Sequence, residues 1–147
     1  MGEKDYSAPM HTAEHILNGT MDKLFGCGRA FSSHVEKKKS KCDYRFSRPL
    51  SDEELRGVES KVNEIISQNL DVTEDFMGRK EAEQQFNLSR LPESAGDTLR
   101  IIRIGSYDAC PCIGTHVWNT SEIGRFKIIS SDYNDGVLRI RFKRETI

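Results

Sequence analysis

The residues of this chain that could do metal chemistry lie in two short clusters far apart in the sequence. His11 and His15 are four residues apart. On a helix this spacing places both imidazoles on one face, so their nitrogens can reach a single cation. Cys112 and His116 have the same spacing, and Gly114 between them permits a tight turn. Three imidazoles and one thiolate suit a borderline-soft ion, so the clusters together predict a Zn²⁺ site. Its four ligands are His11, His15, Cys112 and His116.

Two residues next to these ligands have roles that the sequence leaves open. Cys110 is separated from Cys112 by a single proline, so either thiol, or both, could supply a sulfur ligand. We favour Cys112 and interpret Cys110 as a buried neighbour. Glu14 is the only acid inside a ligand cluster. As a catalytic residue it would relay protons or orient a ligand, and otherwise it is an ordinary solvated residue of the helix.

The elements that must position the first cluster are indicated by apolar spacing and by end signals. Apolar residues at helical spacing predict a helix over residues 10–25, which carries both histidines and ends at Gly26. Ser51 and Glu54 are typical of a capping box, and they open a long central helix over residues 51–69. Further elements expected in this half are strands over 30–35, 42–46 and 72–77 and a short helix over 79–86.

The second half of the chain has the pattern of strands. Strands are expected over residues 98–104, 124–130 and 137–142, with an Asp135-Gly136 turn between the last two. Residues 91–96 are expected to form a loop, and residues 105–111 a turn-rich connection. Helices first and hairpins second predict an α+β fold. We expect one compact domain spanning 1–147, with an N-terminal His-bearing helix, a long central helix and antiparallel β-strands.

Length and composition exclude several classes of protein. A chain of 147 residues has room for one ordinary domain, and no apolar run approaches the ~18 residues of a membrane-spanning helix. The first five residues lead into no apolar stretch, so we expect no secretory signal, a cytoplasmic location and no membrane partner. The net charge of −1 excludes a globally basic nucleic-acid binder, although it permits a local basic patch.

The two clusters together resemble one protein family. A His-x-x-x-His near the start of a helix, followed late in the chain by Cys-x-Gly-Thr-His-Val, is similar to the editing domain shared by alanyl- and threonyl-tRNA synthetases. The free-standing AlaX-type trans-editing proteins carry the same domain. The likeness extends to residues 119–128, the central helix and the last strand, so it covers nearly the whole chain. Because 147 residues leave no room for an aminoacylation domain, the chain looks like the short, stand-alone form.

The resemblance implies an activity, a cofactor and a partner. The family hydrolyses the ester that joins a wrong amino acid to the terminal ribose of a tRNA, commonly serine or glycine on alanine tRNA, without ATP. By resemblance the chain is a Zn²⁺-dependent deacylase whose partner is tRNA rather than DNA. The basic runs over 37–41 and 139–144 are candidates for contacts with RNA phosphates. Ser33 and Thr115 are candidate hydrogen-bond donors to a serine hydroxyl or to the ester.

Two positions depart from the family pattern. Ile113 stands where the family commonly has glycine, which would narrow the pocket or stiffen the loop. Ala30 stands where many members have glutamine. If that glutamine positions substrate, its loss affects efficiency or amino-acid choice rather than the metal.

Two other functions fit parts of the same pattern. A non-catalytic module that binds tRNA or a synthetase, with zinc in a structural role, is compatible with a closed site of three histidines and one cysteine. The segment 11–15 also fits the His-x-x-Glu-His pattern of the inverted zincin proteases, with Glu14 as the base. A protease of that kind needs an open coordination position, which Cys112 and His116 would fill.

Overall fold

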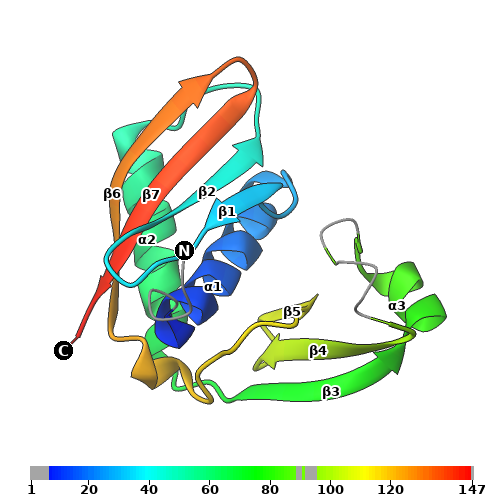
Figure 1. Ribbon diagram of the computed structural model, residues 1–147. Helices are drawn as coiled ribbons and strands as arrows, with labels where there is room; N and C mark the ends of the chain where they lie inside the picture. The colour runs from blue at the N-terminus through cyan, green and yellow to red at the C-terminus, as the bar shows by residue number, and fades with distance from the viewer. Residues whose placement is uncertain (1–6, 89–90, 92–95, 147) are drawn as a thin grey trace.

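Three α-helices and two antiparallel sheets make up the described part of the chain, which is residues 7–88, 91 and 96–146 of a computed structural model (Figure 1). The helices are α1 (Ala8–Phe25), α2 (Asp52–Ser67) and α3 (Arg79–Gln85), and a 3-10 turn, η3, covers Thr120–Glu122. The strands are β1 (Ser32–His34), β2 (Ser40–Arg45), β3 (Val72–Gly78), β4 (Thr98–Ile104), β5 (Asp108–Pro111), β6 (Arg125–Asn134) and β7 (Val137–Glu145). The predicted α+β class is confirmed. The five N-terminal residues used in the secretion argument, and most of the loop expected over 91–96, lie outside the described residues.

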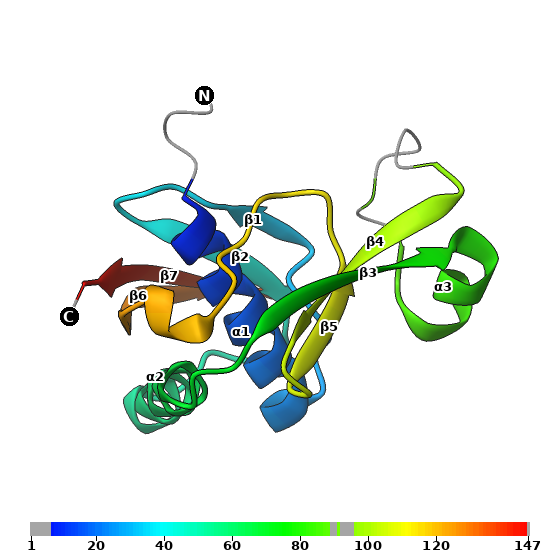
Figure 2. The same ribbon diagram turned by 90° about the horizontal axis from the view of Figure 1, so that it is seen from below.

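Helix α1 lies between the two sheets. The larger sheet has the strand order β1-β2-β7-β6, and the smaller has the order β3-β4-β5. Figure 2 shows α1 in the middle, with the larger sheet on one side, the smaller sheet on the other and α2 beside α1. Because α1 contacts both β5 and β7, it is the element that joins the two sheets. The histidines predicted on α1 are therefore close to both halves of the chain.

Alternate side chains of β2 and β7 point into the main core. Cys42 and Tyr44 of β2 and Ile140 and Phe142 of β7 are fully buried on the face that packs against the helices. The residues between them in sequence face the other side of the sheet, as the period of two in a strand requires. α2 adds its own apolar stripe to the same core; its members are Val58, Val62, Ile65 and Ile66.

The two long helices begin and end at the expected signals. Ser7 caps α1 by accepting a hydrogen bond from the Met10 N–H at 3.2 Å, so the helix starts two residues earlier than predicted. Gly26 ends it in the left-handed conformation, with φ of 65°. The capping box of Ser51 and Glu54 is present in both directions. None of the helices among the described residues combines the length and the apolar character needed to cross a bilayer.

The largest difference from the sequence prediction concerns residues 105–111. They were expected to form a turn-rich connection, but residues 108–111 form β5, which pairs with β4 from Ile104↔Asp108 to Ile101↔Pro111. Gly105, with φ of 52°, allows the tight reversal that makes this pairing possible. The consequence for the site is direct, because Cys112 is the first residue after β5. The last two strands also run further than predicted, to Asn134 and Glu145.

Candidate metal centre

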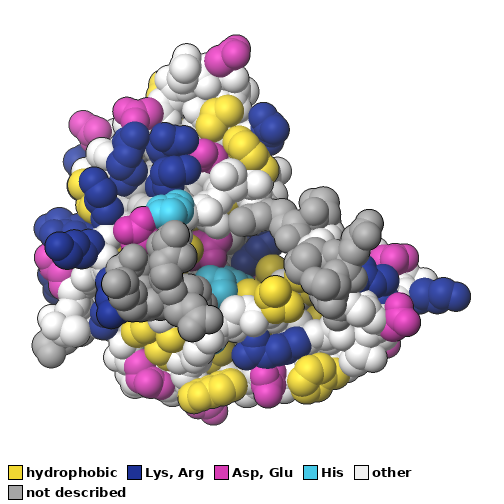
Figure 3. All heavy atoms as spheres, viewed as in Figure 1, with side chains coloured by type: hydrophobic (Ala, Val, Ile, Leu, Met, Phe, Trp, Pro, Cys, Tyr) yellow, Lys and Arg dark blue, Asp and Glu magenta, His cyan; other side chains and the backbone are white. Residues whose placement is uncertain are grey.

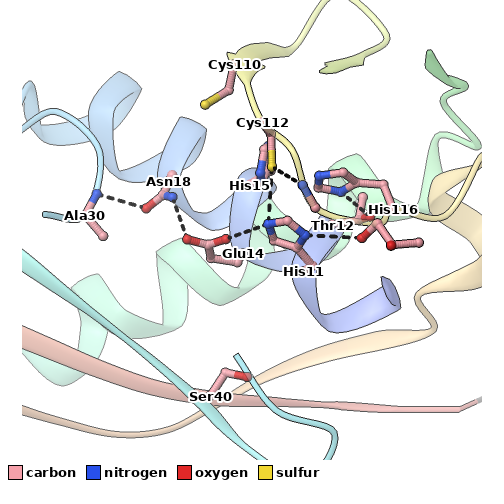
Figure 4. A network of polar contacts seen from close by, with 12 residues as sticks. His11, Thr12, Glu14, His15, Asn18, Ala30, Ser40, Cys110, Cys112 and His116 are labelled. Carbon is pink, nitrogen blue, oxygen red and sulfur yellow. Dashed lines mark hydrogen bonds and ion pairs between the residues drawn. The ribbon is translucent and has the colours of Figure 1, made fainter. Parts of the chain in front are cut away.

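The structure brings the four predicted ligands to one point between α1 and the segment that follows β5 (Figure 4). One ligand atom from each of His11, His15, Cys112 and His116 lies within 4.8 Å of the other three. The Sγ of Cys112 is 3.5 Å from Nε2 of His11. Two ligand atoms of a tetrahedral Zn²⁺ lie about 3.3–3.8 Å apart, given metal–ligand bonds of about 2.0–2.3 Å. The side chains therefore need only small adjustments to share one ion.

The tautomer of His116 is set by Thr12. The Thr12 hydroxyl donates to the Ala8 carbonyl at 3.1 Å and accepts from the Val117 N–H at 3.2 Å. A hydroxyl has one proton and two lone pairs, so its remaining lone pair accepts from Nδ1–H of His116, 2.9 Å away. Nε2 of His116 is then an unprotonated, buried nitrogen with no hydrogen-bond partner among the described residues. A buried lone pair of this kind is what a metal ligand offers, and the donor set therefore fits a zinc ion.

The tautomer of His11 is set in the same way by a backbone carbonyl. Nδ1 of His11 is 3.2 Å from the carbonyl oxygen of Thr115, which can only accept, so Nδ1 donates its proton there. Nε2 then presents its lone pair toward Cys112. The loop after β5, which supplies the Cys112 thiol and the His116 imidazole, thus also orients His11. In turn, Thr12 on α1 orients His116.

Asp108 stands behind His15. Its Oδ2 is 3.9 Å from Nδ1 of His15, and both carboxylate oxygens accept from Arg29, at 2.7 and 3.2 Å. Gly19, one turn along α1 from His15, makes room for this carboxylate, because a Cβ at that position would lie 2.9 Å from Oδ1 of Asp108. A carboxylate that accepts a hydrogen bond from a metal-ligating histidine holds it in place; here the 3.9 Å separation is longer than a hydrogen bond, so a small shift of either side chain would form that contact.

The loop that carries Cys112 is fixed by Arg100 on β4. Its Nη1 donates to the carbonyl of Cys112 at 3.2 Å and to that of Gly114 at 2.7 Å. Burial raises the pKa of the Cys112 thiol, and the Gly114 N–H, 3.4 Å from Sγ, lowers it in part. A divalent cation would supply the positive charge that a buried thiolate requires.

Cys110 lies outside the cluster. Its side chain points away from the four ligands in Figure 4, and its thiol donates to the adjacent Pro111 carbonyl at 3.4 Å. Burial raises the pKa of this thiol to about 11. The geometry therefore supports our choice of Cys112 as the sulfur ligand, with Cys110 as its neighbour.

Glu14 is buried rather than solvated, with 5 % of its surface exposed. One carboxylate oxygen, Oε1, lies 3.6 Å from Nε2 of His11, and the other accepts from the Asn18 amide at 3.3 Å. Asn18 is held in turn by the Tyr44 hydroxyl at 2.8 Å and by the Ala30 N–H at 3.1 Å, both donating to its Oδ1. This buried chain of hydrogen bonds fixes a carboxylate at the edge of the ligand cluster.

Comparison with known proteins points to one family. A family model described as the threonyl and alanyl tRNA synthetase second additional domain matches residues 99–141, which include Cys112 and His116. An alanine–tRNA ligase of Staphylothermus marinus is 38% identical over 141 residues, covering 92% of this chain and 15% of the ligase. The alanine–tRNA ligase of Pseudothermotoga lettingae is 35% identical over 136 residues, covering 91% of this chain and 16% of its own length. That of Clostridioides difficile is 35% identical over 126 residues, covering 84% and 14%.

The predicted resemblance to this synthetase editing domain is confirmed. The chain spans about a seventh of the length of the ligases it matches. The match to those ligases covers more of the chain than residues 99–141 do.

The two departures from the editing-domain pattern have clear positions. Ile113 is 66 % exposed and lines a pocket of about 100 Å³ beside Cys112, with Phe76, Leu99 and Arg100 also on its wall. Ala30 is buried, and its backbone N–H rather than a side chain contacts Asn18. Ile113 therefore lies on the wall of a small pocket beside Cys112, whereas Ala30 leaves the contact with α1 intact.

The two hydroxyl residues expected to contact substrate have different surroundings. Thr115 contributes its carbonyl to His11, and the residue is exposed. Ser33 is half-buried on β1, opposite Cys42. Their roles as hydrogen-bond donors to substrate stay predictions.

The sequence analysis missed the residues that contact the four candidate ligands, or the carboxylates beside them, from the side away from the cluster. These are Thr12, Asn18, Arg29, Arg100 and Asp108. Thr12 and Asn18 carried a weak signal, because they share with His11 and His15 the face of one helix. The other three lie on β4, on β5 and in the loop between α1 and β1, and no local pattern marks them.

Acid is expected to destabilise the metal-free chain through His116. Burial, together with the nearby charges of His11 and Arg100, lowers the pKa of His116 to about 3. The ordinary pKa of about 6.5 applies when the chain is unfolded, so the unfolded chain binds the proton first. The stability contributed by neutral His116 is complete above about pH 6.5 and is lost as the pH falls toward 3. Between about pH 7 and pH 5 the loss amounts to about 2 kcal/mol.

Urea unfolding of chelator-treated protein at these two pH values measures that loss. His116→Asn should remove most of it, whereas His34→Asn, at an exposed position on β1, should leave it unchanged. An equal loss in wild type and His116→Asn would show that another group is responsible.

Proposed function

We propose that this chain is a Zn²⁺-dependent aminoacyl-tRNA deacylase that acts in trans on serine or glycine wrongly attached to alanine tRNA. One observation carries the proposal: three imidazoles and one thiol from segments about a hundred residues apart meet at one point. This occurs in a chain that is similar over most of its length to part of alanine–tRNA ligases. The proposed ligands are His11, His15, Cys112 and His116.

The chemistry needs little beyond positioning and charge. An aminoacyl ester is already activated, so its hydrolysis requires no ATP and no covalent nucleophile. A zinc ion held by the four ligands would supply positive charge, as a Lewis acid, to the ester carbonyl or to the attacking water. We place the activity in the cytoplasm, where charged tRNA is used.

Glu14 is the residue that we propose as the acid and base. The side chain of His11 is 13% exposed, so substrate and water can approach beside it, and Glu14 lies within 3.6 Å of its Nε2. The Glu14 carboxylate takes up the proton that the attacking water loses and returns it to the ribose oxygen that leaves. Asn18 holds the carboxylate in position through its other oxygen.

Selection of serine over alanine would depend on hydrogen bonds to the serine hydroxyl. A site built to bind that hydroxyl rejects alanine, because its polar groups are left unpaired when the hydroxyl is missing. Ser33 and the Thr115 side chain are the donors that we propose. Ile113 narrows the space beside Cys112, so small amino acids such as serine and glycine are favoured.

Deacylation by the purified chain tests the proposal. Seryl- and glycyl-tRNA(Ala) are expected to lose their amino acid in the presence of the zinc-loaded chain, and alanyl-tRNA(Ala) is expected to be spared. Glu14→Gln should slow turnover by about 100-fold or more while the chain still binds zinc. Binding of tRNA without release of the amino acid would favour the non-catalytic module. Cleavage of peptides, with Glu14 as base, would favour the protease.

A further inference from the structure

The open face of the larger sheet is basic. Along β2 and β7 the buried residues alternate with cations, so Lys41, Arg139, Arg141 and Lys143 project from the side opposite the core. α1 and α2 both pack on the core side. Lys127 of β6 faces the same way as its partner Lys143. The two basic runs noted in the sequence, about a hundred residues apart, are therefore neighbours on one surface.

Strand register places like charges directly opposite each other on this face. Lys41 pairs with Arg141 across β2 and β7, and Lys127 pairs with Lys143 across β6 and β7. Like charges at facing positions destabilise a sheet. Neighbouring acids offset part of this repulsion through the ion pairs Lys41–Asp43, Arg141–Asp132 and Lys143–Glu145, and an anionic partner would offset more of it.

The loop between β1 and β2 adds to the same surface. It contains Lys37, Lys38 and Lys39, all exposed, and it enters β2 at Ser40, which pairs with Phe142 next to Lys143. Among the described residues no ion pair involves these three lysines or Lys127.

This surface carries a net positive charge, whereas the whole chain is slightly negative. We call it the basic sheet face, and its cations are Lys37, Lys38, Lys39, Lys41, Lys127, Arg139, Arg141 and Lys143. The acids beside them are Glu36, Asp43, Asp132 and Glu145. Eight cations against four acids give this face a charge of about +4, while the whole chain has a net charge of −1. The rest of the molecule is therefore acidic, and an anionic partner is directed to this face.

The position of the face fits a partner that also enters the metal centre. Figure 3 shows Lys and Arg side chains gathered over the larger sheet, on the side of the molecule that is hollowed between the two sheets. A histidine side chain lies in that hollow. A long polyanion can contact the basic face and extend one end into the hollow from the same side.

We propose that the basic sheet face binds the sugar–phosphate backbone of the tRNA whose 3′ end enters the metal centre. This rests on the proposed function, because it takes tRNA as the substrate. Lys and Arg side chains without a row of exposed aromatic rings among them suit phosphate contacts rather than base stacking. Recognition by this face is therefore independent of sequence and sensitive to salt.

Binding of uncharged tRNA tests this surface separately from catalysis. The variant Lys39→Gln/Lys127→Gln/Lys143→Gln removes three cations from the basic sheet face. It should weaken tRNA binding by about 10-fold or more at about 100 mM salt, and it should reduce the slope of log Kd against log salt by about 2–3. The dissociation constant is measured by fluorescence anisotropy from about 50 to about 200 mM KCl.

A matched control removes three cations from other surfaces. Arg56→Gln/Lys61→Gln/Lys80→Gln changes the net charge equally, with two positions on α2 and one on α3. It should bind tRNA within about 2-fold of wild type, with the same salt slope. Equal loss in both variants would mean that only net charge matters, and no loss in the first would remove the basic sheet face as the tRNA surface.

The two proposals can fail independently. If wild type hydrolyses seryl-tRNA(Ala) and the first variant binds tRNA normally, the deacylase stands and this surface is wrong. If the first variant loses tRNA binding while wild type hydrolyses no mischarged tRNA, the surface stands and the deacylase is wrong. Thermal melts of both variants test whether the fold is intact, and these solvent-facing changes are expected to leave the melting temperature nearly unchanged.

Discussion

Replacing Cys112 with serine is expected to release zinc from the purified chain, whereas the same change at Cys110, two residues away, is expected to leave zinc bound. The Sγ of Cys112 belongs to the cluster of four ligand atoms, and Cys110 does not. Loss of an outer partner of a metal ligand commonly costs 10–100-fold in affinity, so loss of the thiolate itself should cost about 100-fold or more. Deacylation of seryl-tRNA(Ala) should fall with the zinc.

The pair of variants is informative because the two cysteines are only two residues apart, yet only Cys112 belongs to the ligand cluster. Both are partly buried, and burial raises the pKa of both. Zinc content of the purified proteins, with a competition titration against a chromophoric chelator, measures the difference. Zinc loss in Cys110→Ser, or zinc retained in Cys112→Ser, would show that the ligand sulfur had been assigned to the wrong residue.

The four candidate ligands could be predicted from the sequence, because the two residues within each cluster are only four positions apart. Four-residue spacing on a helix fixes the relation of His11 to His15 without any tertiary contact. Helix ends were also predictable, since Ser51 and Glu54 act within one turn. The convergence of the two halves was inferred from their complementary donor types, and the resemblance to a known family strengthened it, because no physical rule from local sequence brings residue 11 next to residue 115.

Most of the supporting residues could not be predicted, because their partners are distant in sequence. Thr12 acts on His116, and Arg29 acts on Asp108, across separations of 104 and 79 residues. Asp108 also lies in the segment expected to be a turn, and only its pairing with β4 places it behind His15. A strand of four residues next to a glycine turn gives too short a pattern to separate from a loop.

Replacing Asp108 with alanine is expected to destabilise the metal-free chain and to weaken zinc binding as well. Burial alone would lower the pKa of Arg29, and the Asp108 carboxylate, 2.7 Å away, reverses this and raises it. Removing one partner of a buried ion pair typically costs about 3–5 kcal/mol. The Arg29 side chain is 30% exposed, so water compensates in part, and we expect about 2–3 kcal/mol.

The weaker zinc binding has a different origin, which a second variant can separate. Asp108→Ala removes the carboxylate beside Nδ1 of His15, and zinc affinity should fall about 10–100-fold. In Asp108→Ala/Arg29→Met no unpaired guanidinium remains, so much of the lost stability should return while zinc affinity stays low. Urea unfolding after chelation measures the stability, and chelator competition measures the zinc affinity.

If the double variant is as unstable as Asp108→Ala, the stability loss comes from packing around Gly19 rather than from the unpaired charge. If zinc affinity returns with Arg29→Met, Asp108 does not act on His15 directly, and the carboxylate serves the fold alone.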